Sequence, residues 1–458
     1  MVESLHTMKE SIKRKLVVIG AGESGVGAAI LGKKKGYDVF VSDFGKVQQE
    51  YKNTLIDAAI EFEEDGHTES RILDADVVVK SPGIPQTANI LKRIREKGIE
   101  IVSEIEFAAQ YTSAKLICIT GSNGKSTTAT LTWFILDKAG LNVGLAGNIG
   151  KSFALQVANE EYEYYVLEIS SFMLDDMSML KADFAILLNI TPDHLDRYDD
   201  KMENYVRSKF KILQNQDEND VFIFNEDDEE IQKGLEIYKS KAKYLPFSQV
   251  KPVKEGAFLD ETKNIVVQVK NQSPFIMSIN ELALQGKHNV YNNMASGIVA
   301  KVLELRNESI RESMGEYQNI EHRLEHVSLI GGINFINDSK ATNVNSVWYA
   351  LESMPANVVL IMGGVDKGND YNILKDLIKS KVSAIVCIGK DNERIYDAFE
   401  NETGVIVNTD SMKEAVNLAY NLAKKGDTVL LSPACASFDL FKNYEDRGNQ
   451  FKAAVREL

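Results

Sequence analysis

The sequence passes from an apolar segment into a glycine-rich loop at Lys115-Leu-Ile-Cys-Ile-Thr-Gly-Ser-Asn-Gly-Lys-Ser-Thr-Thr128, and a helical pattern follows over residues 129–139. A strand, a glycine-rich loop and a helix in this order form the setting in which such a loop binds phosphate, because the backbone N–H groups and the N-terminus of the helix attract an anion. The stretch therefore predicts a parallel α/β sheet that carries a phosphate-binding loop.

Individual residues of this loop have separate expected roles. Lys125 can reach the outer phosphates of a nucleotide, and Ser126 is placed to hold Mg²⁺. The other loop residues expected at the nucleotide are Gly121, Ser122, Asn123, Gly124 and Thr127. The pattern departs from the full P-loop signature, which has a glycine where this chain has Ile119. A turn that only joined strand to helix would not need a lysine and hydroxyl groups in this order, so we interpret the loop as a variant of the class.

Strand and helix patterns alternate on both sides of this loop. The stretches that read as strands are residues 15–19, 39–42 and 75–79, then 115–120, 164–167, 184–189 and 221–224, then 333–337, 358–362, 384–388 and 428–431. Three such blocks predict an α/β fold with three domains, each binding ligands at the carboxyl ends of its strands. We expect a Rossmann-like N-terminal domain over 1–103, a central P-loop-type ATPase domain with a parallel sheet over 104–319, and a Rossmann-like C-terminal domain over 320–458.

Composition places the chain among globular proteins. Of its 458 residues, 44% are hydrophobic and only 8 are proline, so there is apolar material for several cores and no long disordered tract. The net charge of −15 argues against nonspecific binding to nucleic acid or to an anionic membrane, because both depend on clustered positive charge. No apolar run is long enough to span a bilayer, and the first fifteen residues lack the apolar core of a signal peptide. We expect a cytoplasmic protein with no nucleic-acid or membrane partner and with reduced, buried cysteines.

Two strands of the middle block end in residues suited to magnesium. Glu168 ends the strand at 164–167, and His194 follows the strand at 184–189. Mg²⁺ takes few protein ligands and keeps water and phosphate oxygens, so sparse ligands are what its chemistry predicts. The helical stretch 202–213 contains Lys209, on the face of Tyr205, and also Lys211. Helical periodicity alone predicts that both lysines are solvated charges.

A glycine turn in the first block supports a rival interpretation. Gly20-Ala-Gly-Glu-Ser-Gly25, with Asp43 at the end of the next strand, fits the dinucleotide fingerprint of a nicotinamide dehydrogenase. A hydride-transfer enzyme, however, has no use for Lys125 and its magnesium. A non-enzymatic, nucleotide-gated binding protein is a further alternative, which would need the phosphate loop but no second anion site.

Taken together, the motifs of nearly the whole chain resemble those of the Mur ligases of peptidoglycan synthesis. The resemblance is carried by Gly121–Thr128, Gly147–Gly150, Glu168–Phe172, Asp193–Arg197, Ser208–Lys209, Gly286–Asn293, His322–Arg323, Asn337–Asn343 and Ser432–Asp439. The phosphate loop, Glu168, His194 and His322–Arg323 are also similar to folylpolyglutamate synthases. Residues 338–343, 432–437 and 443–449 are similar to the D-glutamate-adding members of the family.

This resemblance implies an ATP-dependent amide ligase that acts on small molecules with ATP and Mg²⁺. The expected reaction activates the carboxylate of a UDP-linked muramoyl-alanine as an acyl phosphate and joins it to D-glutamate, and we expect a monomer. Another Mur ligase, or a ligase like folylpolyglutamate synthase, stays open as an alternative. The three domains would then bind the UDP-linked substrate, ATP and the incoming amino acid, in that order along the chain.

The resemblance also implies roles for individual residues. Lys209 would be carbamylated and join Ser126, Glu168 and His194 as a metal ligand, and Lys125 would neutralise charge during phosphoryl transfer. ATP would also contact Asn289, Arg323, Asp338 and Lys340. The UDP-linked substrate would contact Ser24, Asp43, Ser81 and Asn148, and D-glutamate would contact Thr342, Lys367 and Ser437. Either His322 or Asp338 could accept the proton of the amine, and the sequence does not choose between them.

Three positions depart from the family pattern. Phe438 stands where leucine is expected and Tyr444 where phenylalanine is usual, and both are expected to pack against the amino acid. Met173 replaces a common glutamine and removes an amide from the expected metal neighbourhood. Lys367 and Ser437 could also simply cap turns, since glycine-rich turns often recruit such residues.

Overall fold

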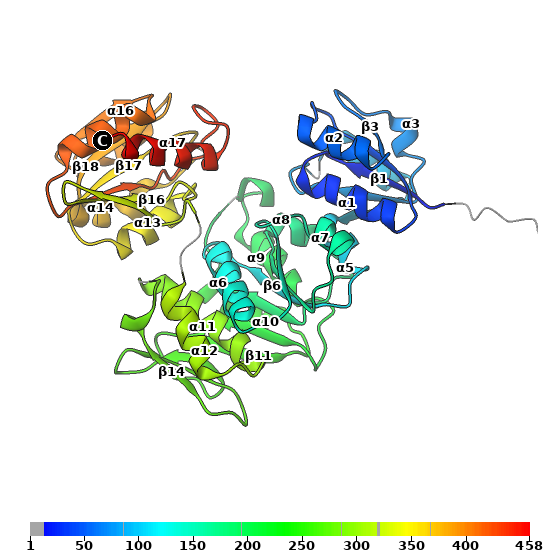
Figure 1. Cartoon of the computed structure of the whole chain (residues 1–458), viewed down its shortest axis with the longest axis horizontal. Helices are drawn as coiled ribbons and strands as arrows, with labels where there is room; N and C mark the ends of the chain where they lie inside the picture. The colour runs from blue at the N-terminus through cyan, green and yellow to red at the C-terminus, as the bar shows by residue number, and fades with distance from the viewer. Residues whose placement is uncertain (1–12, 86, 194, 285, 318–320, 367) are drawn as a thin grey trace, which may run out of the picture. The chain divides into compact units, whose positions relative to one another are not determined.

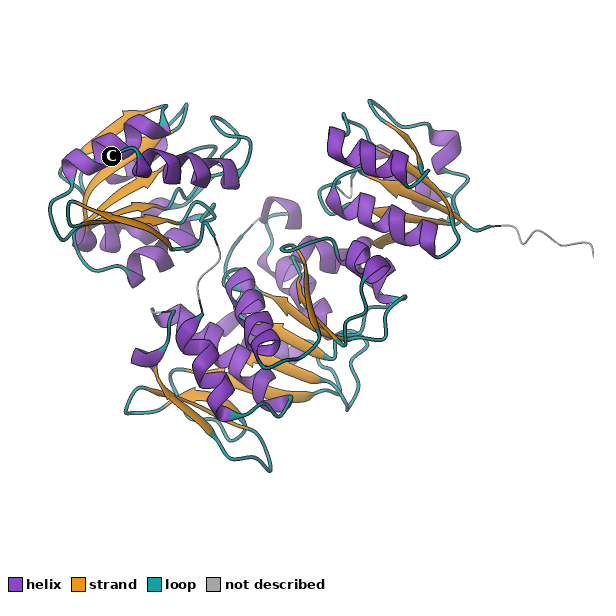
Figure 2. Ribbon diagram, in the orientation of Figure 1, coloured by secondary structure: helices purple, strands orange, loops and turns teal. Residues whose placement is uncertain are grey.

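A computed structural model describes residues 13–85, 87–193, 195–284, 286–317, 321–366 and 368–458. The fold contains three β-sheets with helices on their faces (Figures 1 and 2). The chain divides into two compact units. The first reaches to Gly121 and includes Leu136–Ile190 and Leu195–Leu245, and the second includes Ser122–Ile135 and Pro246–Leu458.

The first sheet has five strands in the order β3-β2-β1-β4-β5, all parallel. The strands are β1 (Lys15–Ile19), β2 (Asp38–Ser42), β3 (Glu61–Glu63), β4 (Val77–Lys80) and β5 (Glu100–Ser103). The helices that belong to it are α1 (Glu23–Lys34), α2 (Gln49–Asp57), α3 (Glu69–Ile72) and α4 (Asn89–Glu96). Alternate residues of β1 enter different cores: Leu16 and Val18 join the one that contains Leu31 of α1, and Val17 joins the one that contains Leu91 of α4. Burial on both faces explains why these strands are continuous apolar runs.

The central sheet has nine strands in the order β14-β13-β12-β11-β10-β9-β6-β8-β7. The strands are β6 (Lys115–Thr120), β7 (Val143–Gly147), β8 (Tyr164–Glu168), β9 (Phe184–Leu187), β10 (Val221–Asn225), β11 (Lys243–Ser248), β12 (Gly256–Leu259), β13 (Asn264–Gln268) and β14 (Phe275–Ser278). The helices are α5 (Glu104–Ala109), α6 (Lys125–Lys138), α7 (Phe153–Asn159), α8 (Ser171–Asp175), α9 (Met202–Phe210), α10 (Glu229–Ile237), α11 (Lys287–Val302) and α12 (Asn307–Glu316). Strand β6 pairs in parallel with β8 and β9, so the phosphate loop, Glu168 and the segment after β9 leave the same edge of the sheet.

The third sheet has six strands in the order β15-β16-β20-β17-β18-β19. The strands are β15 (Glu325–Ile330), β16 (Ile333–Asn337), β17 (Val358–Met362), β18 (Val382–Ile388), β19 (Ile406–Thr409) and β20 (Thr428–Leu431). The helices are α13 (Val344–Ser353), α14 (Lys375–Lys381), α15 (Glu393–Phe399), α16 (Met412–Leu422) and α17 (Tyr444–Arg456). All pairs are parallel except β15–β16, which is antiparallel. The loops after β16, β20 and β17 therefore leave one edge side by side.

The predicted α/β class with three domains is confirmed, and the differences are local. Strand β9 ends at Leu187, two residues before its predicted end. Helix α6 begins at Lys125 instead of residue 129, directly at the phosphate loop, and the predicted helix over 202–213 ends at Phe210 and continues as a 3₁₀ turn. Several strands had not been predicted: β3, β5, β7, β11, β15, β19 and the strands β12 to β14, two of whose pairings are antiparallel. Among the described residues, no helix is long and apolar enough to cross a membrane.

Candidate functional site

The phosphate loop has the backbone that its glycines allow. Gly124 has φ +83°, in the left-handed region that favours glycine. A Cβ on Gly121 would lie 3.0 Å from the Cβ of Leu188, so this position also has little room for a side chain. The Ser122 hydroxyl donates to the main-chain oxygen of Thr191 at 2.8 Å and accepts from its N–H at 2.9 Å. Lys125 Nζ donates to the main-chain oxygen of Ser122 at 2.7 Å, so the loop holds its own lysine.

A small polar pocket adjoins this loop. Its lining residues are Asn123, Gly124, Thr127, His288, Asn289, Arg323, Leu324, Asp338, Ser346, Tyr349 and Ala350. Six of these are predicted nucleotide-binding residues, which the fold brings together from four separate parts of the sequence. His288, Ser346 and Tyr349 had no predicted role. Two signals in the sequence could have identified them. His288 directly precedes the predicted residue Asn289, and Ser346 and Tyr349 are one helical turn apart on α13.

Asn289 and its neighbours fix the start of α11 beside the phosphate loop. The Asn289 side-chain oxygen accepts a hydrogen bond from Asn292 at 3.0 Å, and the Thr128 hydroxyl donates to the side-chain oxygen of Asn292 at 3.1 Å. Asn289, Asn292 and Thr128 are all buried. Because buried polar groups are costly unless paired, this chain of bonds holds α6 and α11 in one arrangement.

His288 is a neutral, half-buried ring in this pocket. Its ring centroid lies 4.7 Å from that of Tyr349, and Nδ1 is buried without a hydrogen-bond partner among the described residues. Burial, with a smaller contribution from the positive charge of Arg323, lowers the pKa of His288 to about 3. Arg323 Nε is likewise buried without a hydrogen-bond partner in the described part of the chain. Unpaired polar atoms in a pocket of this kind are suited to a polar ligand.

Asp338 follows β16 and supplies the carboxylate of the pocket. It accepts hydrogen bonds from the Ser432 hydroxyl at 2.8 Å and from the Leu324 N–H at 3.2 Å. Burial raises the pKa of Asp338 to about 6, although Arg323 and the two hydrogen bonds oppose the shift. A carboxyl with this pKa changes its protonation state near neutral pH.

Glu168 has the geometry of a metal ligand. It is 1% exposed, one carboxylate oxygen accepts from the Asn148 amide at 3.1 Å, and the other is buried without a partner among the described residues. A buried, unpaired carboxylate oxygen at a strand end fits a divalent cation. His194 lies outside the described residues, and Ser126 is buried at the start of α6. The described residues contain no group of three or more His, Cys, Asp or Glu side chains placed to hold a metal.

Lys209 is buried, which contradicts the solvated position predicted from helical periodicity. It is 1% exposed, and its Nζ donates to the main-chain oxygen of Gly121 at 2.8 Å and to the Thr120 hydroxyl at 3.2 Å. The Nζ also lies 5.2 Å from the ring centroid of Tyr205, on the predicted face of α9. Lys211 is half-buried and donates to the main-chain oxygen of Asp175 at 2.8 Å. Helical periodicity placed Lys209 on the correct face of α9. It could not show that β6, the strand that leads into the phosphate loop, packs against that face.

Three candidates for the UDP-linked substrate meet at the first glycine turn. Asp43 accepts from the Ala21 N–H at 2.6 Å, and the Ser81 hydroxyl donates to the main-chain oxygen of Gly20 at 3.3 Å. Ser24 lies in the first turn of α1. Asn148 instead contacts Glu168 at the central sheet. Glu23 is exposed and accepts from the Ser152 N–H at 3.1 Å.

Sequence analysis missed a buried ion pair at the end of β4. Lys80 Nζ lies 2.9 Å from a carboxylate oxygen of Asp176, with side chains 2% and 7% exposed. The same Nζ donates to the main-chain oxygens of Ser81 and Ile84, each at 3.2 Å. Lys80 therefore holds the loop that carries Ser81. A lysine after an apolar strand gave no sequence signal, because its partner lies almost a hundred residues away.

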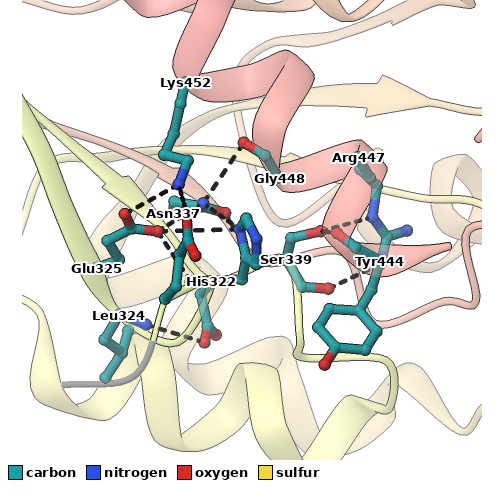
Figure 3. Close-up of polar contacts among 11 residues, drawn as sticks. His322, Leu324, Glu325, Asn337, Ser339, Tyr444, Arg447, Gly448 and Lys452 are labelled. Atoms are coloured by element: carbon teal, nitrogen blue, oxygen red, sulfur yellow. Dashed lines mark hydrogen bonds and ion pairs between the residues drawn. The ribbon is translucent and has the colours of Figure 1, made fainter. Parts of the chain in front are cut away.

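His322 belongs to a closed network in the C-terminal domain (Figure 3). Its Nδ1 accepts from the Asn337 amide at 2.9 Å, and the same amide donates to Glu325 at 3.0 Å. Lys452 bonds to Glu325 as well, at 3.2 Å. Burial lowers the pKa of His322, and the nearby Lys452 acts in the same direction. A Cβ on Gly448 would lie 2.2 Å from His322 Nδ1, so only glycine fits beside this ring.

The candidates for the amino acid lie on loops of the third sheet. Ser437 is buried, Thr342 is exposed, and Phe438 is 70% exposed. Lys340 Nζ lies 5.5 Å from the ring centroid of Tyr444, whose main-chain oxygen accepts from the Ser339 hydroxyl. Lys367 lies outside the described residues.

Three family models match successive parts of the chain. They are the MurD N-terminal domain over residues 15–90, the Mur ligase middle domain over 119–300, and the glutamate ligase domain of Mur ligases over 322–435. Among curated proteins, the UDP-N-acetylmuramoylalanine–D-glutamate ligase of Christiangramia forsetii is 55% identical over 97% of this chain and all of its own length. The enzyme of the same name from Bacteroides fragilis is 54% identical over the same shares.

Solved structures show the same fold at low sequence identity. The UDP-N-acetylmuramate-alanine ligase of Thermotoga maritima superimposes with a TM-score of 0.63 at 16% identity, over 97% of this chain and 99% of that one. A MurF structure from Acinetobacter baumannii gives a TM-score of 0.62 at 17% identity, over 96% of this chain and 93% of that one.

Proposed function

The chain belongs to the Mur ligase family of ATP-dependent, amide-forming ligases, and from this premise we propose that it adds D-glutamate to UDP-N-acetylmuramoyl-L-alanine in peptidoglycan synthesis. The observation that carries the reaction class is the phosphate loop beside a pocket in which Arg323 and Asp338 meet. The name shared by relatives above 50% identity over the full chain supplies the substrates.

The proposed reaction has two bond-forming steps. A carboxylate oxygen of the muramoyl-alanine attacks the γ-phosphorus of ATP, and the bond from that phosphorus to the ADP oxygen breaks. The nitrogen of D-glutamate then attacks the acyl carbon, phosphate leaves with the bridging oxygen, and the nitrogen loses a proton. The products are an amide, ADP and phosphate. The acyl phosphate is required because a free carboxylate is a poor electrophile.

The phosphate loop would stabilise the charge of the first step. Its N–H groups and Lys125 bind the outer phosphates, and phosphoryl transfer depends mainly on such positioning and charge neutralisation. Arg323 lines the same pocket and adds a second positive charge. The lysine must leave its bond to the Ser122 oxygen to reach a phosphate, which is a small side-chain movement.

Residues of the central sheet would hold Mg²⁺. Ser126, Glu168, His194 and a carbamylated Lys209 form the proposed ligand set. Bound there, Mg²⁺ would neutralise phosphate charge. The unpaired oxygen of Glu168 supports this assignment, and so does the burial of Lys209 against the loop strand. An ammonium would be repelled by the metal, whereas a carbamate on the same nitrogen would be attracted.

The glycine turn at Gly20 would bind the UDP part of the substrate. A pyrophosphate is suited to the N-terminus of α1, and Asp43 is suited to a ribose hydroxyl. Ser24 and Ser81 flank this turn, and Asn148 is proposed to contact the same substrate at the central sheet. The nicotinamide dehydrogenase and the nucleotide-gated binding protein are not retained, because full-length relatives are named as ligases.

Of the two candidates for the proton acceptor, the geometry supports Asp338 better than His322. Asp338 lines the pocket and has a pKa raised to about 6. His322 is not among the residues that line this pocket, and its Nδ1 is engaged by Asn337. Lys340 would contact ATP beside Asp338. Thr342, Lys367 and Ser437 would contact the carboxylates of D-glutamate, with Phe438 and Tyr444 packing nearby.

An amino-acid panel tests the proposal. The purified protein, ATP, Mg²⁺ and UDP-N-acetylmuramoyl-L-alanine are incubated with D-glutamate, L-alanine, meso-diaminopimelate or L-lysine, and phosphate and the mass of the product are measured. Amide formation with D-glutamate alone is expected. Preference for any other member of the panel would assign the chain to another branch of the family. We further propose that the protein is a monomer and acts in the cytoplasm on small molecules. Light scattering of the pure protein tests whether it is a monomer.

A further inference from the structure

The side chain of Arg447 makes hydrogen bonds to three loops of the C-terminal domain. It lies in the first turn of α17 and is 0% exposed. Its Nε donates to the Ser339 hydroxyl at 3.0 Å and one Nη donates to the Ser339 main-chain oxygen at 2.9 Å. The other Nη donates to the main-chain oxygens of Cys435 at 3.1 Å and Gly363 at 3.4 Å. Figure 3 shows the guanidinium turned toward Ser339.

The three bonded loops follow three neighbouring strands. Ser339 comes after β16, Cys435 after β20 and Gly363 after β17, and these strands are adjacent in the sheet. The loops are those that carry the proposed contacts of the incoming amino acid, Thr342 and Ser437 among the described residues. One side chain therefore sets the relative positions of loops that the strands alone would leave independent.

Two of these loops, those after β17 and β20, are also in direct contact and leave no space for a side chain on Gly364. Val365 and Ala436 exchange backbone hydrogen bonds of 2.8 and 3.2 Å. A Cβ on Gly364, whose φ is +129°, would lie 2.2 Å from the Ala436 oxygen and 3.3 Å from an Nη of Arg447. The guanidinium thus fills the space beneath both loops.

The charge of Arg447 has no carboxylate hydrogen-bonded to it. Each bond that it makes with the described residues ends on a neutral oxygen. Burial lowers the pKa of Arg447 to about 10, against the opposing effects of Cys435, Asp439 and Asp338, so the group stays charged at neutral pH. Asp439 and Asp338 are near enough to stabilise this charge electrostatically, while the hydrogen bonds of the guanidinium are all made to oxygens of the three loops.

We propose that Arg447 is a positioning and specificity-determining residue for the incoming amino acid. It holds the loops after β16, β17 and β20 in one arrangement, and this arrangement fixes the relative positions of the groups on these loops that are proposed to bind the two carboxylates of the amino acid. This inference rests on the proposed function. Lysine cannot replace arginine here, because an ammonium lacks the planar fork that reaches three loops at once.

The test compares Arg447→Lys with Arg456→Lys, an exposed position on the same helix. KM for D-glutamate, ATP and the UDP-linked substrate is measured for each, with circular dichroism to check folding. Arg447→Lys should raise KM for D-glutamate by about tenfold or more, while the other two KM values change by less than about twofold. Arg456→Lys should match the wild type.

A second variant and a wild-type control complete the test. If Arg447→Lys does not fold, Ser339→Ala, which removes one acceptor, should raise the same KM by a smaller factor. A KM for D-glutamate unchanged in the folded variants, or a parallel rise in all three KM values, would overturn the inference. A wild-type protein that does not ligate D-glutamate would overturn the proposed function instead, so the two failures are distinguishable.

Discussion

Lys209 on α9 donates a 2.8 Å hydrogen bond to the main-chain oxygen of Gly121, the first residue of the phosphate loop. The lysine is buried, and the Thr120 hydroxyl is its second acceptor. The positive charge of Lys209 lies at the end of the strand that leads into the loop. A change of this charge would therefore change the electrostatic potential where phosphate is expected to bind. Carbamylation would reverse that charge and create an oxygen ligand.

Removing this lysine should abolish most of the activity. Lys209→Ala is expected to lower kcat by at least about a hundredfold, because the proposed metal ligand would be lost. Added short carboxylic acids should restore part of the rate by occupying the place of the carbamate. Lys211→Ala, two residues along the chain and half-buried, is the matched control and should stay near the wild-type rate. Absence of rescue while Mg²⁺ still binds normally would refute the carbamate role.

The buried pair Lys80–Asp176 should matter for stability. Lys80→Met leaves the carboxylate of Asp176 buried beside an apolar chain and should lower the free energy of unfolding by about 3–5 kcal/mol. The double variant Lys80→Met/Asp176→Leu should recover much of this loss, because the uncompensated charge is gone. Urea unfolding followed by circular dichroism measures both. A double variant as unstable as Lys80→Met would contradict the explanation.

Glu104 should make stability depend on pH. It is buried and accepts hydrogen bonds from the Ser152 hydroxyl at 2.7 Å and the Ala154 N–H at 2.6 Å. Burial raises its pKa to about 7, with a smaller contribution from Glu23. The stabilisation is complete below the ordinary pKa of about 4.5 and is lost as pH rises through about 7, by roughly 3 kcal/mol in all.

The measurement for Glu104 is the free energy of unfolding at pH 5 and pH 8. Glu104→Gln keeps an acceptor oxygen but cannot ionise, so its difference between the two pH values should be smaller than that of the wild type by most of this amount. Glu100→Gln, on the exposed start of β5, should leave the wild-type difference unchanged. Equal pH dependence in the wild type and Glu104→Gln would show that the carboxyl does not titrate in this range.

His288 should remain neutral over the whole working range. Because burial and Arg323 lower its pKa to about 3, its ring signals in ¹⁵N-resolved NMR should not shift between pH 5 and pH 8. The signals are assigned by comparison with His288→Gln. A titration midpoint for this ring inside that interval would show that the pocket is open to water.

Sequence reasoning succeeded where local pattern decides the structure. Strand β6 has its predicted bounds, and the phosphate loop follows it as predicted although α6 already begins at Lys125, because apolar β-branched runs, glycines and a lysine act over a few residues. The pocket residues Asn289, Arg323 and Asp338 were found through resemblance, and the fold brings them together with the loop. No spacing rule joins these three, because they lie on separate elements.

What sequence reasoning missed depends on tertiary burial. Lys209 and Lys80 look like solvated charges in the sequence, and only packing against Gly121 and Asp176 removes them from water. Arg447 sits in a polar helix start that reads as exposed, yet it is fully buried. A side chain whose partners are remote in sequence leaves no local signal, and these are the residues that fix the site.

Transfer of oxygen-18 tests the acyl-phosphate route most directly. UDP-N-acetylmuramoyl-L-alanine labelled with oxygen-18 in its free carboxylate is ligated to D-glutamate with unlabelled ATP, and the inorganic phosphate is analysed by mass spectrometry. Because the carboxylate oxygen that attacks phosphorus departs with the phosphate, each phosphate released should carry one labelled oxygen. Unlabelled phosphate, or label in AMP, would contradict the account.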